Sequence, residues 1–529
     1  MEDLIRTVPE NCAVDGPERN TLVPAKPKPF SHQIDCLNDS IKKLETNISI
    51  YNTAPTGAGK TCIAFMIAEA RNSKIFVVAP PVVLKDWEKK SKEYGSDMIG
   101  ISYDLLLGKG AKCNHPYLVK ENSVDDCAGY APTKELHDLI DKGTIFVFDE
   151  VDESKNPDTQ RLAACHTITK TIVSSRNNSR ILLMSATLID KKKYAESILK
   201  LLGIIKRDQL IKYFPGTRRY DSKNSGYDEV YNYCMSINPE ETKRLVPSRL
   251  SAKAIKDSTY DMLCKVIKDR IGTSMPKARL DVKFYPEIRY YSTDTLRKYS
   301  IEDTQVDEIK RRVSSLRNTM ITIGSKITRM KDPPGAIMMY LHHIENGMLT
   351  LLTKILYDKL LKFPDRKFII YVWFDSSVDY LMATFSKFKP LRCDGQTKKN
   401  DKSINVDLFQ RADTEYRLIF AKPTSFSKGI NLDDTDGRFP RETICIPNFY
   451  FGLIHQAAGR TCRSLTKSNS YFSLIFIKDA DILDILKSLH EKSTVSYDAI
   501  IDKCDVDNKI IYPSEYPIVY DEENSHLEN

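Results

Sequence analysis

A glycine-rich stretch, TAPTGAGKT at residues 53–61, constrains the fold of this chain more than any other feature. It follows the strand-like ISIYN and opens a segment with helical spacing, which is the context that a phosphate-binding loop requires. Lys60 would reach the β- and γ-phosphate oxygens, and Thr61 would hold Mg²⁺. The sequence therefore predicts a site for ATP and Mg²⁺. The predicted nucleotide-binding residues of this loop are Thr56, Gly57, Ala58, Gly59, Lys60 and Thr61.

An acidic pair ends a second apolar stretch, FVFDEVDES at residues 146–154. Asp149 would bind in the Mg²⁺ shell, and Glu150 would orient or deprotonate the attacking water. Taken alone, two carboxylates at the end of a strand are as often a solvated turn. Together with the loop at 53–61 they favour a hydrolytic site.

The pattern between residues 30 and 205 alternates short β-branched runs with longer segments of helical spacing. Apolar runs such as KIFVVAP (74–80) and RILLMSA (180–186) predict buried parallel strands. A second alternation of the same kind begins near residue 346. We expect an α/β protein with two RecA-like lobes and parallel sheets, joined by a mostly helical insertion.

The expected domain limits follow these changes in pattern. Residues 206–345 are basic, rich in tyrosine and mostly polar, with one strand-like piece at 281–291. The chain ends in a polar, acidic segment that predicts a frayed end or a docking segment. The limits are 1–29 for an extended leader, 30–205 for the ATP-binding lobe, 206–345 for the insertion, 346–492 for the second lobe and 493–529 for the tail.

A second motif, HQAAGRTCR at residues 455–463, lies in the expected second lobe. Its QxxGRxxR spacing places Arg460 and Arg463 one helical turn apart on one face, with Gln456 before them. Fixed guanidinium groups suit the charge that develops on a transferred phosphoryl group, so both are arginine-finger candidates. The alternative is a solvated basic helix end.

The order of these motifs across two α/β halves resembles helicase superfamily 2, over about residues 30–470. In that superfamily a triad matching Ser185, Ala186 and Thr187 links the acidic motif to the nucleic-acid surface. The stretch FSKGINLDD (426–434) resembles the loop that couples nucleotide to strand contacts, with Gly429 as its informative glycine. Gln33 resembles the upstream glutamine that reads adenine, although a surface glutamine is the ordinary alternative.

Finer features resemble the Swi2/Snf2 group. They include DEVDESKN (149–156), PPVVLKDWEKK (80–90) with its tryptophan, and VKFYPEIRYYSTDTLRKYS (282–300). The layout is similar to that of the poxvirus nucleoside triphosphatase, which acts with a viral RNA polymerase, and to helicases of yeast cytoplasmic linear plasmids. That resemblance implies a polymerase and an mRNA-capping enzyme as partners. Asp152 stands where the superfamily often has a histidine that senses the γ-phosphate, which puts the coupling at this position in doubt.

A basic run at residues 310–331 contains no acidic residue. Such a run binds phosphates without reading sequence, or it is only a solvated face. The net charge of +8 gives mild independent support for a polyanionic partner. We expect nucleic acid, DNA rather than RNA, to contact this run. Its candidate residues are Lys310, Arg311, Arg312, Arg317, Lys326, Arg329 and Lys331.

The twelve cysteines are scattered without a CxxC pair, which predicts reduced thiols rather than a disulfide framework. The set Cys113, His115, Cys127 and His137 has zinc-binding residue types, but its spacing fits no common finger. No apolar run is long enough to span a membrane, and the first twenty residues lack the features of a signal peptide. We expect a cytoplasmic protein without a membrane partner, and a nuclear location stays open.

The sequence is compatible with three functions. The first is an ATP-driven translocase on duplex DNA that remodels polymerase complexes or releases transcripts. The second is a strand-separating helicase acting on RNA or DNA. The third is a catalytically idle scaffold, against which the intact Lys60, Asp149, Glu150, Arg460 and Arg463 argue.

Overall fold

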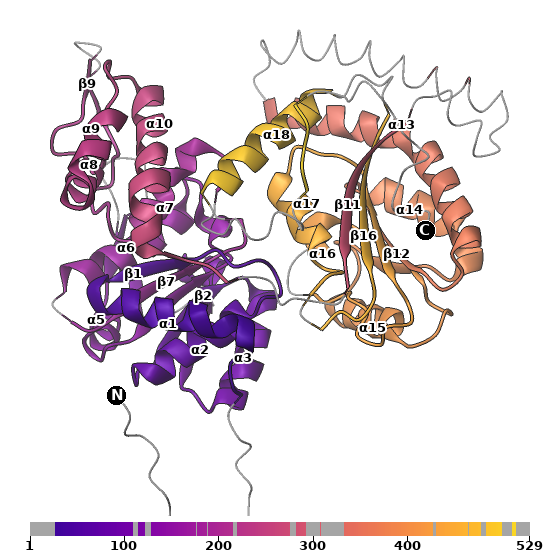
Figure 1. The fold of residues 1–529 in the computed structure, drawn as a ribbon, viewed down its shortest axis with the longest axis horizontal. Coiled ribbons are helices and arrows are strands. Elements are labelled where there is room, and N and C mark those ends of the chain that lie inside the picture. Colours follow the sequence, from indigo (N-terminus) through magenta and orange to yellow (C-terminus); the bar gives the residue numbers. More distant parts are fainter. Residues whose placement is uncertain are drawn as a thin grey trace, which may run out of the picture.

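The chain forms two α/β lobes, each built on a six-stranded sheet (Figure 1). Every strand pairing within these two sheets is parallel, which confirms the expected fold class. The computed structural model describes residues 27–108, 115–121, 129–175, 177–187, 189–214, 219–275, 282–291, 307, 311, 333–426, 430–463, 465–477, 483–499 and 510–514.

The sheet of the first lobe has the strand order β10-β1-β7-β6-β2-β3. Parallel strands point their carboxyl ends to the same edge, so the segments after β1, β6 and β7 meet there. These three segments carry the phosphate loop, the acidic pair and the Ser-Ala-Thr triad. The strands are β1 (Ser49–Asn52), β2 (Ile75–Ala79), β3 (Met98–Ser102), β6 (Ile145–Asp149), β7 (Arg180–Met184) and β10 (Gly272–Thr273).

Helices cover both faces of this sheet, which is why its strands read as continuous apolar runs rather than alternating ones. In β6, Ile145 and Val147 pack into the core on one face, and Phe146 and Phe148 pack into the core on the other. The surrounding elements are α1 (Ser31–Thr46), α2 (Lys60–Ala70), α3 (Pro81–Tyr94), α4 (Tyr103–Leu106), α5 (Lys134–Asp141), α6 (Gln160–Ser174), α7 (Ala195–Leu201) and the hairpin β4 (Leu118–Glu121) with β5 (Gly129–Pro132).

The segment expected as a separate insertion is shared between the two lobes. Residues 226–271 form helices whose apolar side chains, such as Val230 and Ile255, join the core of the first lobe. Strand β10 then extends the first sheet, whereas β11 (Phe284–Tyr291) pairs with β16 in the second. The polar composition of this segment did not reveal that it contributes to both lobes, because each of its helices buries only one stripe of apolar side chains. The helical elements are α8 (Gly226–Ile237), α9 (Pro239–Leu245), α10 (Ala252–Met262) and α11 (Lys268–Ile271), next to the hairpin β8 (Lys212–Phe214) and β9 (Arg219–Asp221).

The second lobe has the strand order β11-β16-β15-β12-β14-β13. Its core holds a buried charge cluster at the start of β15, where Glu442 contacts Lys359 at 2.8 Å and Arg366 at 2.6 Å. The strands are β12 (Lys367–Tyr371), β13 (Leu391–Cys393), β14 (Leu418–Ala421), β15 (Arg441–Cys445) and β16 (Ser470–Ile477). The helices are α13 (Pro333–Lys362), α14 (Asp375–Thr384), α15 (Lys399–Gln410), α16 (Pro423–Phe426), α17 (Phe451–Ala458) and α18 (Leu483–Asp498).

Helix α18 connects the two lobes (Figure 1). Its Leu486 and Leu489 pack into the core of the second lobe, whereas Ala499, just beyond its end, is buried in the core of the first. The Tyr260 hydroxyl donates to the Val495 carbonyl at 2.9 Å, which fixes the far end of the helix on α10. Further along the expected tail, Tyr512 is buried against the second lobe.

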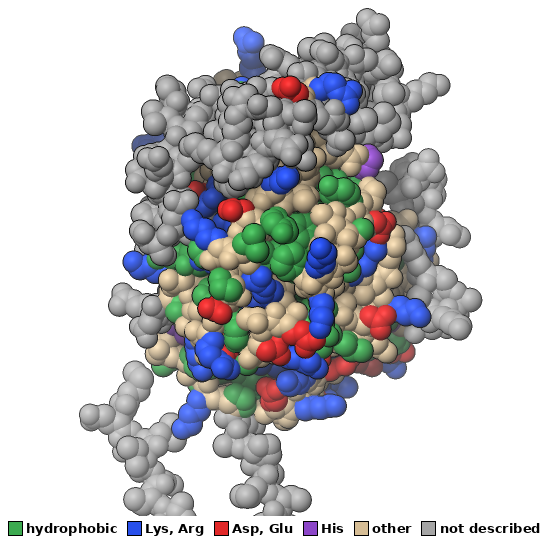
Figure 2. All heavy atoms as spheres, turned by 90° about the vertical axis from the view of Figure 1, so that its right-hand side faces the viewer, with side chains coloured by type: hydrophobic (Ala, Val, Ile, Leu, Met, Phe, Trp, Pro, Cys, Tyr) green, Lys and Arg blue, Asp and Glu red, His purple; other side chains and the backbone are tan. Residues whose placement is uncertain are grey.

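The outward face of the second lobe mixes small apolar areas with Lys and Arg side chains (Figure 2). The exposed large apolar side chains of the second lobe include Tyr357, Leu361 and Tyr380. Within the described part of the chain, no helix is both long enough and apolar enough to cross a bilayer.

Candidate nucleotide site between the lobes

The glycine-rich loop connects β1 to the first residue of α2. Gly57 (φ +82°) and Gly59 (φ +93°) both take the left-handed conformation that side chains other than glycine rarely adopt. A Cβ atom at Gly59 would lie 2.2 Å from Nε2 of Gln33, and one at Gly57 would lie 2.9 Å from Cγ of Arg463. The positive φ angles therefore favour glycine at both positions, and at Gly57 the Arg463 side chain also leaves little room for a Cβ atom.

Lys60 is held inside this loop at the start of α2. Its ammonium donates to the carbonyl of Ala54 at 2.8 Å and to that of Pro55 at 3.3 Å. Burial lowers the pKa of Lys60, and the nearby carboxylates of Glu150 and Asp149 oppose that shift. The ammonium thus lies between the loop and the acidic pair, where phosphate oxygens bound in the loop would meet it. Thr61 follows it in the first turn of α2.

The acidic pair lies at the carboxyl end of β6. Asp149 is buried, and its Oδ1 accepts the Glu150 N–H at 2.9 Å while Oδ2 accepts the indole N–H of Trp87 at 2.8 Å. Burial raises the pKa of Asp149, opposed by the Trp87 hydrogen bond and the charge of Lys60. Glu150 has φ +52°, a conformation that is rare outside glycine and that concentrates at functional sites.

Two arginines of the second lobe complete the site. Arg460 and Arg463 each direct one guanidinium nitrogen to the Ile430 carbonyl at 3.3 Å. The Nε atoms of both are buried and have no hydrogen-bond partner among the described residues. Burial, and then the charge of Arg460, lower the pKa of Arg463 to about 9, so it stays protonated at neutral pH. Buried guanidinium donors without partners fit a phosphate anion.

The motifs of the two lobes are in contact. Nε2 of Gln456 donates to Oε2 of Glu150 over a long 3.5 Å, and Gly459 lies so close to Thr56 that an added Cβ would be 2.2 Å from Oγ1. The QxxGRxxR segment of the second lobe therefore lies directly against the phosphate loop. The sequence placed these residues 306 positions apart in the chain, and the fold unites them.

The Ser-Ala-Thr triad lies beside this contact. Ser185 Oγ accepts the Thr187 N–H at 3.2 Å and donates to its carbonyl at 3.1 Å, which makes a tight turn after β7. A Cβ added to Gly452, in the first turn of α17, would lie 3.8 Å from the Thr187 hydroxyl. This hydroxyl thus faces the helix that carries Gln456, as a coupling role would require.

The Gln33 side chain forms a hydrogen bond with the backbone of the phosphate loop. Its amide donates to the Ala58 carbonyl at 3.0 Å, and its Oε1 accepts the Phe30 N–H at the same distance. The side chain is buried, so the alternative of a surface glutamine does not describe it. Both ends of the amide are already engaged, and an adenine contact by Gln33 stays a prediction.

Several predicted residues fall outside the described part of the chain. These are Gly429 of the coupling loop, Cys113 and Cys127 of the zinc candidates, and all of the basic run except Arg311. His115 contacts the Leu106 carbonyl at 2.9 Å, and His137 is exposed. No group of three potential metal ligands occurs among the described residues. The residues of the run outside the description are Lys310, Arg312, Arg317, Lys326, Arg329 and Lys331.

Two residues near the acidic pair were missed by sequence reasoning as parts of the site. Trp87 binds the Asp149 carboxylate, and the Tyr103 hydroxyl donates to the Asp149 carbonyl at 2.9 Å. Their place in the site depends on strand order, because β2 lies next to β6 and β3 next to β2, so the residues after both strands reach the sheet edge of the acidic pair. That order could not be read from the sequence before the fold was known.

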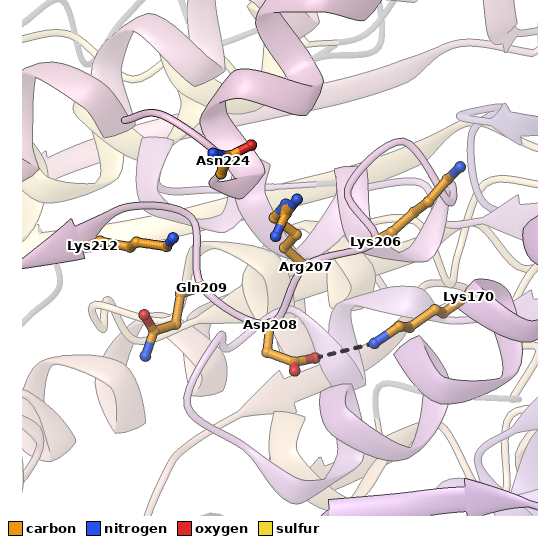
Figure 3. A pocket seen from close by; sticks show the side chains of 7 residues that line it. All are labelled: Lys170, Lys206, Arg207, Asp208, Gln209, Lys212 and Asn224. Atoms are coloured by element: carbon orange, nitrogen blue, oxygen red, sulfur yellow. Dashed lines mark ion pairs between the residues drawn. The ribbon is translucent and has the colours of Figure 1, made fainter. Parts of the chain in front are cut away.

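A basic pocket of about 490 Å³ lies on the first lobe, apart from this site (Figure 3). It is formed mainly by the segment after α7, together with Lys170 of α6. Asp208 pairs with Lys170 at 3.9 Å at its rim. None of the motif residues lines it. Its residues are Lys170, Lys206, Arg207, Asp208, Gln209, Lys212 and Asn224.

The sequence is similar to known ATP-dependent helicases. Residues 26–190 match the family described as type III restriction enzyme, res subunit. A putative ATP-dependent RNA helicase (L364) of Acanthamoeba polyphaga mimivirus is 23% identical over 482 residues, which cover 88% of this chain and 82% of that protein. The DExH-box ATP-dependent RNA helicase DExH9 of Arabidopsis thaliana is 27% identical over 198 residues, which cover 36% of this chain and 18% of that protein.

Among solved structures, the SWI2/SNF2 ATPase core of Sulfolobus solfataricus in complex with double-stranded DNA is 15% identical. The alignment covers 90% of this chain and 94% of that one, with a TM-score of 0.30.

Three findings agree on the kind of protein that this chain resembles. The family match spans the phosphate loop and the acidic pair, the viral relative aligns along most of both chains, and the motifs meet in one site between two parallel-sheet lobes. The chain is a nucleoside triphosphatase whose sequence is similar to the ATP-dependent helicases of superfamily 2.

Proposed function

We propose that this chain is an ATP-driven motor that translocates along nucleic acid, with duplex DNA as its first substrate. One observation carries the proposal: the hydrolytic site is divided between the lobes, with Glu150 on one side and Gln456 on the other. Hydrolysis in such a site requires closure, so each ATP cycle opens and closes the lobes. Two lobes that alternately approach and separate can move along a strand held across them.

The described residues suit the roles that hydrolysis requires. Lys60 and the loop N–H groups bind the β- and γ-phosphates, and Thr61 with Asp149 would hold Mg²⁺. That ion, when bound, would neutralise charge developing on the phosphate oxygens. Glu150 orients the attacking water and takes its proton. Arg460 and Arg463 offer buried guanidinium donors to the transferred phosphoryl group.

The choice of duplex DNA is supported by the Swi2/Snf2-like segments of the sequence, among them the DEVDESKN run at 149–156. The names of the two relatives favour a second candidate, a strand-separating RNA helicase. The resemblance to the poxvirus triphosphatase extends the first candidate to a role in transcription, beside an RNA polymerase and an mRNA-capping enzyme. The eight described cysteines are free thiols, which suits the cytoplasmic location that we propose for this protein.

The substrate is tested by measuring the ATPase rate with duplex DNA, single-stranded DNA and RNA of equal length. Two displacement assays then separate the candidates. Displacement of a triplex-forming strand without unwinding of the duplex supports the translocase. Efficient removal of an annealed RNA strand would instead support the helicase.

A Glu150→Gln variant is the control for both assays, because the amide keeps the shape of the side chain but cannot take a proton. It should bind ATP and fail to hydrolyse it. A Glu150→Gln protein that hydrolyses ATP at the normal rate would exclude the role assigned to this residue.

A further inference from the structure

Trp87 is the largest fully buried side chain of the described structure, and its only polar atom meets the acidic motif. The indole N–H donates to Oδ2 of Asp149 at 2.8 Å. A buried indole N–H requires an acceptor, and a buried carboxylate requires donors, so each satisfies the other. The pair joins α3 directly to the end of β6.

This hydrogen bond sets the orientation of the carboxylate. The χ2 torsion of aspartate is broad and roughly two-fold, so packing alone does not fix where its lone pairs point. Here Oδ1 is held by the Glu150 N–H at 2.9 Å and Oδ2 by Trp87. A carboxylate accepts about four hydrogen bonds, so two lone-pair positions stay available in a defined direction.

Aromatic packing fixes Trp87 in turn. Its ring lies 5.2 Å from that of Phe65 at an interplanar angle of 47°, and Phe65 stacks on Tyr94 at the same centroid distance. Phe65 belongs to α2, which begins at Lys60. The helix that follows the phosphate loop thus holds the ring that orients the acidic residue. Tyr103 restrains the main chain of Asp149 from the other side.

We propose that Trp87 is a positioning residue that acts through Asp149, orienting its carboxylate so that a divalent cation binds with the nucleotide. The inference rests on the proposed function, in which Asp149 belongs to the Mg²⁺ site. Hydrogen-bond partners of metal-binding side chains usually contribute 10- to 100-fold to metal affinity. We therefore expect loss of the indole N–H to weaken cation binding about 10- to 100-fold.

The experiment measures cation binding directly rather than turnover. Mn²⁺ replaces Mg²⁺, and free Mn²⁺ is followed by electron paramagnetic resonance in the presence of a non-hydrolysable ATP analogue. Trp87→Phe removes the N–H and keeps an aromatic ring. Because Phe is smaller and leaves a cavity, a second variant carries benzothienylalanine at position 87, which keeps the shape of the indole and lacks its N–H.

The chain offers a matched control, because its second tryptophan makes the same kind of bond elsewhere. Trp373 donates its indole N–H to the Ile446 carbonyl at 2.8 Å in the second lobe. Trp373→Phe should leave Mn²⁺ affinity unchanged. It also makes Trp87 the sole tryptophan, since the chain contains two. Paramagnetic Mn²⁺ bound with nucleotide should then quench Trp87 fluorescence, and diamagnetic Mg²⁺ should not.

Nucleotide affinity without metal separates positioning from general damage. If Trp87 orients Asp149, both position-87 variants lose Mn²⁺ affinity while a fluorescent ATP analogue binds normally in the presence of a chelator. Unchanged Mn²⁺ affinity in a folded variant would overturn the inference, as would a parallel loss of metal-free nucleotide binding. If the wild-type protein itself binds no Mn²⁺ with nucleotide, the proposed function fails, and this inference with it.

Discussion

A methyl group added at Gly459 should block lobe closure without harming either lobe. Its ideal Cβ lies 2.2 Å from Oγ1 and 3.4 Å from Cβ of Thr56 in the opposite lobe. Within its own lobe, the nearest atom is the Gln456 carbonyl oxygen at an ordinary 3.7 Å. The backbone of Gly459 has φ −74°, which alanine adopts without strain. The penalty of Gly459→Ala therefore falls on the closed state alone.

The size of this penalty follows from the overlap. Thr56 must move away by more than 1 Å to restore normal contact, and its β-branched side chain has few rotamers to choose from. Overpacking of this kind costs about 1–3 kcal/mol. The equilibrium constant for lobe closure should fall by about 5- to 150-fold, which lowers the rate of hydrolysis by up to that factor.

The assay is steady-state ATPase with nucleic acid, together with binding of a fluorescent ATP analogue. Gly459→Ala should reduce kcat and leave the thermal midpoint unchanged. Gly395→Ala, in the same lobe with no atom within 4 Å of its added Cβ, should leave both unchanged. Adding Thr56→Ala should restore much of the rate, because it removes the clashing atoms. A wild-type rate of hydrolysis in Gly459→Ala would refute the contact. The contact would also be refuted if Gly459→Ala lowered the rate as much in a Thr56→Ala background as in the wild-type protein.

Three further outcomes follow from the site and the core. Lys60→Ala should abolish nucleotide binding, measured by equilibrium titration, because the loop loses its only ammonium; retained binding would contradict its role. Glu442→Gln should destabilise the second lobe by about 3–5 kcal/mol in urea unfolding, because the buried Lys359 and Arg366 lose the negative charge that they share. A loss below about 1 kcal/mol would contradict the importance of this buried charge cluster. Burial raises the pKa of Glu345 to about 7, so the folded state holds its proton more tightly than the unfolded state, and stability should fall as pH rises from about 4.5 to 7. This decline amounts to up to about 3 kcal/mol of unfolding free energy, and Glu345→Gln should flatten it when stability is measured across this pH range. An unchanged pH profile in Glu345→Gln would exclude the effect.

The sequence predicted those parts of the structure that depend on neighbouring residues, such as the phosphate loop and the buried strands. The strand-loop-helix context of residues 53–61 and the continuous apolar runs predicted parallel sheets, which the fold confirms. These features depend on near neighbours in the chain, which a single sequence displays. The helical placement expected for Arg460 and Arg463 was wrong, because α17 ends at Ala458 and both arginines lie in the segment that follows it. Both guanidinium groups nevertheless reach the Ile430 carbonyl from that segment.

Features that depend on distant contacts could not be read in this way. Strand β11 joins the second sheet, although its sequence lies in a polar stretch that predicted a separate insertion. The bond from Trp87 to Asp149 depends on β2 lying beside β6, and strand order is a property of the whole fold. Gln33 looked like a candidate base reader, and only the structure shows its amide engaged with the loop.

A single-turnover experiment on Arg460→Ala decides whether the two lobes share one hydrolytic site. Saturating protein is mixed with limiting ATP, and the rate of phosphate formation is measured beside the affinity for ATP. We expect hydrolysis to fall by about 10³-fold or more, as for other arginines that contact the transferred phosphoryl group, while the first lobe still binds ATP. Hydrolysis at the wild-type rate would show that the first lobe is sufficient and would contradict the shared site.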